Sequence, residues 1–372
     1  MSAARSPPSQ RALPAGQLLA RAAALSFGEL GFDGLRELCR SSSAAHAPSA
    51  RLAHDPRDGL PITYSEARAT RPVGRSDGCA VCDDETCPAC DVLQLPGAPS
   101  DAGPDLAWFS PNLYPIAYPF PRGAAGAPVL TGLHLVHWSS LRHADGLVGA
   151  DRERAVATLG QLARAEEFLL HGAGPEWPAS GAGDDGREHR GHCGLVKNRG
   201  RRVGGSVEHD HQQLLFTDQP FLQPSRTVTL AAALAAEAPA ARIVDDVDGL
   251  ALSVVPDFMH RPLHSFVVPL QPRGDGPRRA TRCGWLHHLP APTAAAFALA
   301  LARLTAAVSE DMLRRGSEPA WNLLLHTGPG CAPLAELRPF TQPLGGYEHL
   351  GLYLCEELPE TSAARLRDAL PR

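Results

Sequence analysis

The 372-residue chain lacks several features that would mark an obvious class of protein. It has no strong charge of one sign: the formal net charge is -5 and the isoelectric point is near 6.3, so no basic field attracts nucleic acid. It shows no apolar run that we expect to cross a bilayer, and scattered arginines interrupt residues 1–50 where a signal peptide needs an apolar core. These absences predict a cytoplasmic protein with neither a membrane nor a nucleic-acid partner.

Cysteine is sparse, but its placement is informative. Four of the nine cysteines crowd into CAVCDDETCPAC, residues 79–90, which contains two Cys-x2-Cys pairs. In a reducing compartment this spacing favours a metal site over disulfides. Zinc is therefore an early candidate ligand.

The apolar segments indicate an α+β protein rather than an alternating βαβ chain. An aromatic and proline-rich strand, a bend and a second strand occur twice, in residues 108–138 and again in residues 252–270. This weak internal echo predicts a duplicated unit with antiparallel strands. The apolar segments predict helices at residues 13–40, 151–172, 227–238 and 293–316.

We divide the chain into a helical N-terminal extension with its linker, residues 1–50, and two halves, residues 51–225 and 226–372. Residues 172–190 are rich in glycine, alanine and aspartate and have no periodicity. They are therefore expected to form an exposed insertion in the first half.

The stretch GGSVEHDHQQLLF, residues 204–216, alternates polar side chains ahead of an apolar strand end. In a strand, His209, His211 and Gln213 share one face, because successive side chains point to opposite faces. A neutral imidazole can bind zinc or attack phosphorus, and a glutamine amide can donate to a phosphate oxygen. The preceding glycines, arginines and Asn198 suit an anionic ligand. The residues alone also allow a glycine-rich turn with solvated arginines and incidental histidines.

The run NRGRRVGGSVEHDHQQ, residues 198–213, resembles the active-site signature of the galactose-1-phosphate uridylyltransferase family, a branch of the histidine-triad superfamily. Further segments resemble that family in the same chain order, namely SEARATRP (65–72), CPAC (87–90) with FSPNLYP (109–115), and GYE (346–348) with a following helix at residues 361–370. The resemblance extends from about residue 51 to the C-terminus. It implies a duplicated histidine-triad-like unit, with an antiparallel half-barrel sheet and flanking helices.

The resemblance also implies roles for the matching residues. His211 is expected to be the nucleophile, and Gln213 is expected to hold the transferred phosphate. The residues expected to bind the nucleotide and sugar phosphates are Arg68, Arg71, Asn112, Asn198, Gly205, Ser206, Tyr347 and Glu348. The ligands expected for one structural Zn²⁺ per chain are Cys87, Cys90, His143 and His209. His137 is a rival to His143, and a four-cysteine site with Cys79 and Cys82 is the alternative.

Together these roles imply a uridylyltransferase of galactose metabolism, acting on a nucleotide sugar and a sugar phosphate, and a homodimer. Two other functions stay open: a dinucleoside polyphosphate phosphorylase or hydrolase that uses the same histidine, and a silent, zinc-stabilised nucleotide-binding protein. The chain departs from the family where HDHQQ replaces HPHGQ and where Leu324 replaces a metal-pair histidine, which leaves His326. Leu354 also replaces a glutamine that contacts the hexose, so the acceptor is the least defined part of the prediction.

Overall fold

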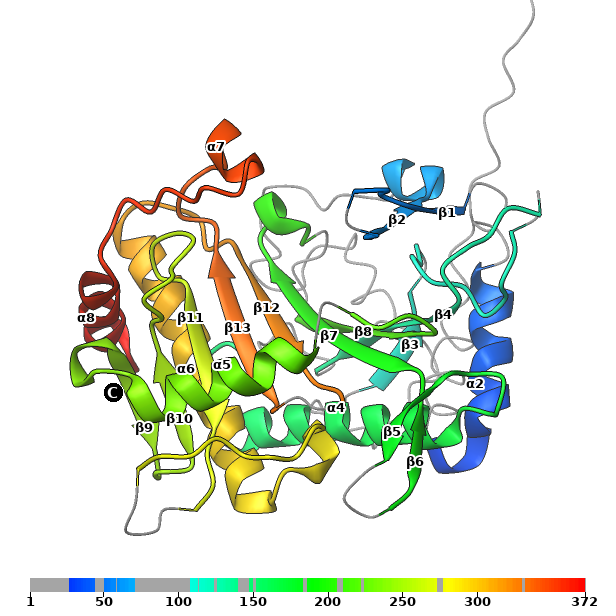
Figure 1. The fold of residues 1–372 in the computed structure, drawn as a ribbon, viewed down its shortest axis with the longest axis horizontal. Coiled ribbons are helices and arrows are strands. Elements are labelled where there is room, and N and C mark those ends of the chain that lie inside the picture. Colours follow the sequence, from blue (N-terminus) through cyan, green and yellow to red (C-terminus); the bar gives the residue numbers. More distant parts are fainter. Residues whose placement is uncertain are drawn as a thin grey trace, which may run out of the picture.

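The computed structural model describes most of the chain. The described residues are 27–43, 50–57, 59–70, 108–112, 114–123, 126–139, 147–149, 152–182, 186–205, 210–221, 224–272, 277–329 and 332–371. Their centre is one nine-stranded sheet in the order β3-β4-β8-β7-β12-β13-β11-β10-β9, and all its neighbouring strands are antiparallel (Figure 1). The sheet is open and does not close into a barrel.

The strands of this sheet are short to medium in length. Their bounds are β3 (Trp108–Pro111), β4 (Gly132–Trp138), β7 (His192–Arg199), β8 (His211–Thr217), β9 (Ile243–Val247), β10 (Ala251–Val254), β11 (Ser265–Pro269), β12 (Trp321–His326) and β13 (Leu334–Pro339). Two small hairpins lie outside it, and they consist of β1 (Arg51–His54) with β2 (Pro61–Tyr64) and β5 (Ala179–Ala182) with β6 (Glu188–Arg190).

The duplication predicted from the sequence is visible in the order of elements. In each half, two adjacent strands precede a long helix and two adjacent strands follow it. The first half has β3 and β4, then α4 (Arg152–Gly172), then β7 and β8. The second half has β10 and β11, then α6 (Ala291–Arg314), then β12 and β13. The strand orders β3-β4-β8-β7 and β10-β11-β13-β12 correspond, and the halves join where β7 pairs with β12. The α+β duplicated fold is thus confirmed.

Helices cover both faces of the sheet unequally. On one face, α4, α6 and two further helices, α2 (Phe27–Ser43) and α8 (Pro359–Ala369), enclose the main hydrophobic core. On the other face, α5 (Pro224–Glu237) packs on the outer strands β10 and β11 and encloses a smaller core (Figure 1). The remaining short elements are α7 (Gly346–His349) and the 3₁₀ turns η2 (Glu66–Thr70), η3 (Arg201–Val203), η4 (Ala240–Arg242) and η5 (Leu286–His288).

The expected exposed insertion at residues 172–190 is right in part: most of its described residues are exposed, but the segment is neither structureless nor exposed throughout. This segment contains the β5–β6 hairpin, and Trp177 and His189 within it are 2% and 0% exposed. Trp177 packs against Phe32 and Phe216, with ring centroids 5.9 and 4.7 Å away. Tertiary packing therefore anchors an otherwise exposed segment through a few buried side chains, Trp177 and His189 among them.

The helix α6 corrects a second expectation, because it is long and apolar enough to cross a bilayer by length and composition. In the fold, 61% of its apolar window is buried, and it packs against the sheet, α4 and α8. Alanine supplies much of this apolar character, and small side chains let neighbouring elements approach closely. The hydrophobicity of α6 is accounted for by its place in the core.

Candidate active site

The alternation predicted for the HDHQQ stretch is present in β8. His211 begins the strand, and its register partner in β4 is Trp138, while Gln213 is paired with Val136. Because paired residues of antiparallel strands share a face, His211, Gln213 and Trp138 lie on the same side of the sheet. We call this side the polar face; the opposite side is enclosed by α4 and α6.

The imidazole of His211 is held against an aromatic neighbour. His211 is 8% exposed, and its ring centroid lies 5.3 Å from that of Trp138 at an interplanar angle of 40°. The indole N–H of Trp138 donates to Ser110 Oγ at 3.0 Å, which fixes the orientation of the indole. A ring packed in this way has few rotamers, and this suits a side chain that has to present one nitrogen in a defined direction.

Gln213 is oriented by His134 of β4. The backbone N–H of Ile116 donates to His134 Nδ1 at 3.2 Å, so Nδ1 carries a lone pair and Nε2 carries the proton. Nε2–H then donates to Gln213 Oε1 at 3.0 Å. This leaves the NH₂ end of the Gln213 carboxamide as the end available to a ligand oxygen.

His134 stays neutral because of its surroundings. Burial and the positive charge of Arg68 lower the pKa of His134 to about 4, against a smaller opposing effect of its hydrogen bond with Gln213. Arg68 lies in η2 and donates to the carbonyl of Tyr114, and Asn112 Oδ1 accepts the N–H of Tyr114 at 2.8 Å. The structure thus brings Arg68 and Asn112, both predicted from the sequence, close to Gln213.

The end of β7 adds a second amide to the polar face. Asn322 of β12 is the register partner of Asn198, and its Nδ2 donates to Asn198 Oδ1 at 2.6 Å and to the carbonyl of Val203 at 3.0 Å. The Asn198 amide nitrogen is therefore turned to the Gly204 side of the loop. Asn322 was not predicted from the sequence, and it positions Asn198 as His134 positions Gln213.

The turn after β7 requires its glycines. Gly200 has φ of +84°, and a Cβ there would lie 2.6 Å from the carbonyl oxygen of Pro319. A Cβ on Gly205 would lie 2.8 Å from the carbonyl oxygen of Gly200, whose carbonyl also accepts the Gly205 N–H at 3.0 Å. The chain folds back on itself here more tightly than any side chain permits. Arg201 and Arg202 are exposed on this turn and add positive charge beside the polar face.

The side chains that alternate with His211 and Gln213 form a buried network on the opposite face. Asp210 pairs with Lys197, the single lysine of the chain, and their side chains are 1% and 4% exposed. Gln212 Nε2 donates to Asp210 at 3.1 Å, and its Oε1 lies 2.8 Å from His137 Nδ1. His137 Nε2 in turn lies 2.8 Å from Gln161 of α4, so this rival zinc ligand has both ring nitrogens in the glutamine network.

The second half carries its own polar cluster on the polar face. Glu336 accepts hydrogen bonds from His264 Nε2 at 2.9 Å, from His326 Nε2 at 3.0 Å and from Arg338 Nε at 2.6 Å. Burial alone would raise the pKa of Glu336, but the hydrogen bonds from both histidines and the charge of Arg338 hold it well below its usual range. His326, which the sequence retains from the expected metal pair, is therefore hydrogen-bonded to a carboxylate in this structure.

Tyr347 and Glu348 lie in the short helix α7. Tyr347 is 62% exposed, whereas Glu348 accepts the backbone N–H groups of Gly345 at 2.8 Å and Leu354 at 3.3 Å. Backbone N–H groups of its own residue, of Gly345 and of Leu354 hold the pKa of Glu348 below its usual range. Both carboxylate oxygens thus organise the 345–354 loop.

The other predicted site residues lie outside the described residues. They are Arg71, Cys79, Cys82, Cys87, Cys90, His143, Ser206 and His209. The predicted zinc site therefore has no geometry here, although His209 precedes His211 by two positions.

Comparison with known proteins identifies the fold through solved structures and not through the sequence. No family model matches the sequence, and no curated protein matches it at a significant level. A solved uridylyltransferase is 19% identical with a TM-score of 0.64, and the match covers 86% of this chain and 98% of the other. The chain has the uridylyltransferase fold.

Two further solved structures share this uridylyltransferase fold. An ADP-glucose phosphorylase from Arabidopsis thaliana, with bound ADP-glucose, is 19% identical with a TM-score of 0.56 and covers 86% of this chain and 98% of its own. A GalT-like protein from the same plant is 17% identical with a TM-score of 0.51, over 70% of this chain and 83% of its own. The neighbours are consistent with the family that the motifs resemble, which confirms the resemblance for the fold.

His134 and Asn322, which orient Gln213 and Asn198, were not predicted from the sequence, and the reasons differ. His134 had a local signal, because it is a lone polar residue on its face of the apolar strand GLHLVHW. Asn322 had none, since its contact with Asn198 depends on pairing between strands more than a hundred residues apart. Only the assembled sheet shows that both hold an amide of the motif.

Proposed function

We propose that this protein is a nucleotidyltransferase that moves a nucleoside monophosphate, UMP by preference, between a nucleotide sugar and a hexose 1-phosphate. The observation that carries the proposal is the pairing of His211 and Gln213 on the polar face, where neutral His134 fixes the Gln213 amide. The uridylyltransferase fold supports the same chemistry. Asn198, Arg68 and the arginines of η3 would supply the donors that a diphosphate needs.

In the proposed mechanism, a ring nitrogen of His211 attacks the α-phosphorus of the nucleotide sugar. The bond between the α-phosphorus and the bridging oxygen breaks, and sugar 1-phosphate leaves with the electron pair. A phosphate oxygen of the second sugar 1-phosphate then attacks the same phosphorus and breaks the P–N bond, which restores the imidazole. The Gln213 NH₂ group would donate to a non-bridging oxygen whose charge grows in both transition states.

Zinc and self-association belong to the same proposal. Cys87, Cys90, His143 and His209 would hold one structural Zn²⁺, and an ion on His209 would fix the chain just before β8. Thiolates and neutral imidazoles form a suitable closed set for zinc. A homodimer is proposed as the assembly.

The acceptor is open between two candidates. The likeness to an ADP-glucose phosphorylase favours inorganic phosphate as a second possible acceptor, because phosphate can resolve the same nucleotidyl-histidine and release a nucleoside diphosphate. The donor panel therefore has to include ADP-glucose and diadenosine tetraphosphate beside UDP-glucose.

The test is covalent labelling. Wild-type protein incubated with α-³²P-labelled donors is expected to gain an acid-labile, base-stable label, and His211→Ala to gain none. His349→Ala, a change at an exposed histidine of α7, is the matched control and should label normally. Gln213→Ala should label about 10²–10³-fold more slowly, since it removes one donor to the transferring phosphoryl group.

The acceptor follows from a chase of the labelled protein with galactose 1-phosphate, inorganic phosphate or buffer alone. Release as nucleotide sugar supports the transferase, and release as nucleoside diphosphate supports the phosphorylase. If no donor labels wild-type protein, nucleotidyl transfer through His211 is contradicted and the silent binding protein is favoured. If His211→Ala is labelled as strongly as wild type, a residue other than His211 is the nucleophile.

A further inference from the structure

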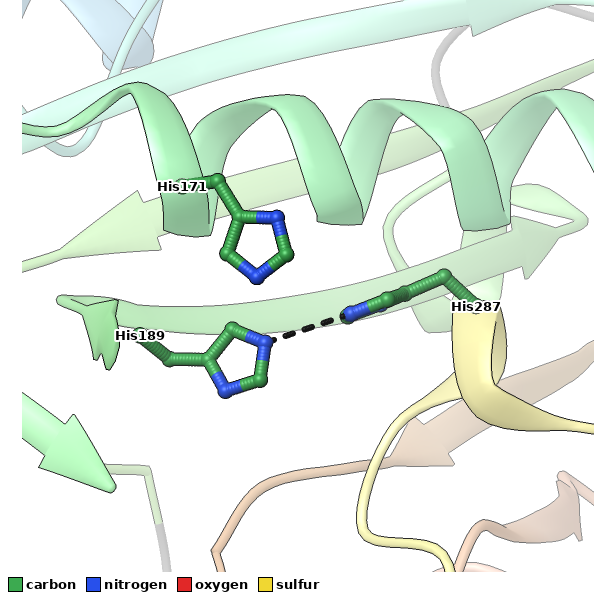
Figure 2. Close-up of side chains that lie close together, drawn as sticks. All are labelled: His171, His189 and His287. Atoms are coloured by element: carbon green, nitrogen blue, oxygen red, sulfur yellow. Dashed lines mark hydrogen bonds between the residues drawn. The ribbon is translucent and has the colours of Figure 1, made fainter. Parts of the chain in front are cut away.

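Three histidines converge away from the polar face, and they come from three elements far apart in the chain. Figure 2 shows His171 at the end of α4, His189 in β6 and His287 in η5, with their rings directed toward one another. One nitrogen atom of each lies within 4.8 Å of the others. The His171 and His189 rings are stacked, with centroids 4.5 Å apart and planes 10° from parallel.

The protonation of His287 follows from its neighbour Glu166. Glu166 is 0% exposed, and its Oε2 accepts the backbone N–H of Leu286 at 2.8 Å and His287 Nδ1 at 2.7 Å. An ionised carboxylate only accepts, so Nδ1 of His287 carries a proton. In the neutral ring, Nε2 then presents its lone pair to the cluster, 3.3 Å from Nε2 of His189 (Figure 2).

This separation fits two ligands of one metal ion. Zn–N bonds of about 2.0–2.1 Å at tetrahedral angles place two ligand nitrogens about 3.3–3.4 Å apart. His189 and His287 already have that spacing. The nitrogen of His171, at the last turn of α4, lies within 4.8 Å of both, and its ring, stacked on His189, has to turn as well as move to become the third ligand.

The buried carboxylate of Glu166 also supports a bound metal ion. Among the described residues, Glu166 forms no ion pair with an arginine or lysine, and its contact with the neutral His287 ring, at 2.7 Å, supplies a hydrogen bond but no positive charge. A fully buried carboxylate without a cation is costly. A divalent ion on the far nitrogen of His287 supplies that charge, and a carboxylate behind a ligand histidine is the usual support of such an ion.

We propose that His171, His189 and His287 bind one divalent transition-metal ion, zinc by preference, with a water molecule as fourth ligand. Glu166 acts as a positioning residue that fixes the tautomer and direction of His287. The ion links the end of α4 and the β5–β6 hairpin of the first half to η5 of the second half. This site shares no residue with the Cys87, Cys90, His143 and His209 set, so it is independent of the proposed function.

The experiment counts metal in the full-length protein after dialysis against Zn²⁺, by elemental analysis. His189→Ala and His287→Gln should each hold about one zinc per chain fewer than wild type, and the exposed control His349→Gln should hold as many as wild type. Glu166→Gln should bind the same ion about 10–100-fold more weakly. Added Zn²⁺ should raise the Tm of wild type more than that of His189→Ala. Cys90→Ser reports separately on the other proposed site.

Equal zinc content in wild type, His189→Ala and His287→Gln overturns the proposal. If these variants fail to fold, anomalous diffraction from wild-type crystals soaked in Zn²⁺ decides. A peak about 2.0–2.1 Å from a nitrogen of each histidine is expected. A soak that gives no peak there, with Co²⁺ and Ni²⁺ soaks also negative, means that the cluster shares a proton instead and overturns the metal site.

Discussion

At the scale of single residues, the candidate site depends on side chains that hold other side chains. His211 is packed by Trp138, Gln213 is held by His134, and Asn198 is held by Asn322. In each case the holding residue comes from a neighbouring strand. Such support restricts the rotamers of the working groups, and catalysis requires that restriction because small displacements cost large factors in rate.

His134 makes this support dependent on pH. The folded protein keeps His134 neutral down to a pKa of about 4, whereas the unfolded chain binds a proton near pH 6.5. Between these values the unfolded state binds more protons, so the contribution to stability is complete above pH 6.5 and is lost as the pH falls toward 4. The loss at pH 5 should be about 2 kcal/mol. The difference in unfolding free energy between wild type and His134→Gln, from urea titrations, should therefore shrink from pH 7.5 to pH 5.

The exposed change His349→Gln is the control for that series, and it should leave the pH dependence of wild type unaltered. A wild-type advantage over His134→Gln that is equal at both pH values would mean that the ring is not kept neutral by burial and by Arg68.

The sequence contained the residue-scale geometry of β8 but not its partners. A strand alternates its side chains with a period of two, so HDHQQ alone places His211 and Gln213 on one face. The partners depend on register between strands, such as Val136 with Gln213, and register is a tertiary property. The cluster of His171, His189 and His287 depends wholly on tertiary structure, because nothing in the spacing of His171 and His287 along the sequence indicates that they meet.

At the scale of elements, the departure from HPHGQ has a structural reason. Asp210 stands where the family has proline, and its carboxylate forms the buried pair with Lys197 of β7. The pair ties the start of β8 to β7 on the face opposite to His211. The negative charge that this departure adds is thus paired on the face away from His211.

Removing one partner of this pair should be strongly destabilising, since it leaves a buried charge alone. Lys197→Met or Asp210→Leu should lower the unfolding free energy by about 3–5 kcal/mol, while the double variant Lys197→Met/Asp210→Leu should recover much of that loss. Urea unfolding of the three variants measures the coupling. The surface pair of Arg57 and Asp55 supplies the control, because the Arg57 side chain is 86% exposed and Arg57→Ala should change little. Additive losses in the double variant would contradict a paired Asp210.

Helices and strands were predicted correctly where a long apolar segment marks them in the sequence. They were missed where the segment is short or where distant elements bury its side chains. The helices α4 and α6 follow their apolar segments, and α8 lies where the family resemblance places a helix. The strands β9 and β13 were missed, because IVDDV and LAELRP are short and mix charges with apolar residues. In the segment 172–190 most described residues are exposed as predicted, but the burial of Trp177 and His189 was missed because distant elements cover them.

At the scale of the whole molecule, the internal echo in the sequence was enough to predict duplication but not how the copies join. They meet edge to edge, as β7 pairs with β12 from Arg199 with Trp321 to Leu195 with Leu325. The main core also contains residues of both halves, including Leu133 and Leu301. The polar face is continuous across this seam, which is why Asn322 of the second half can position Asn198 of the first.

The two halves should therefore fold only together. If the chain is cut at residues 222–223, between β8 and α5, each part exposes a long strand edge and half of a shared core. Neither part alone should show a cooperative urea transition by circular dichroism, and an equimolar mixture should regain one at high concentration. The intact chain with a flexible insertion at the same point is the control, because it keeps both parts at high effective concentration. A steep, cooperative transition in either isolated part would show that a half has a core of its own and that the β7–β12 seam is only a docking contact.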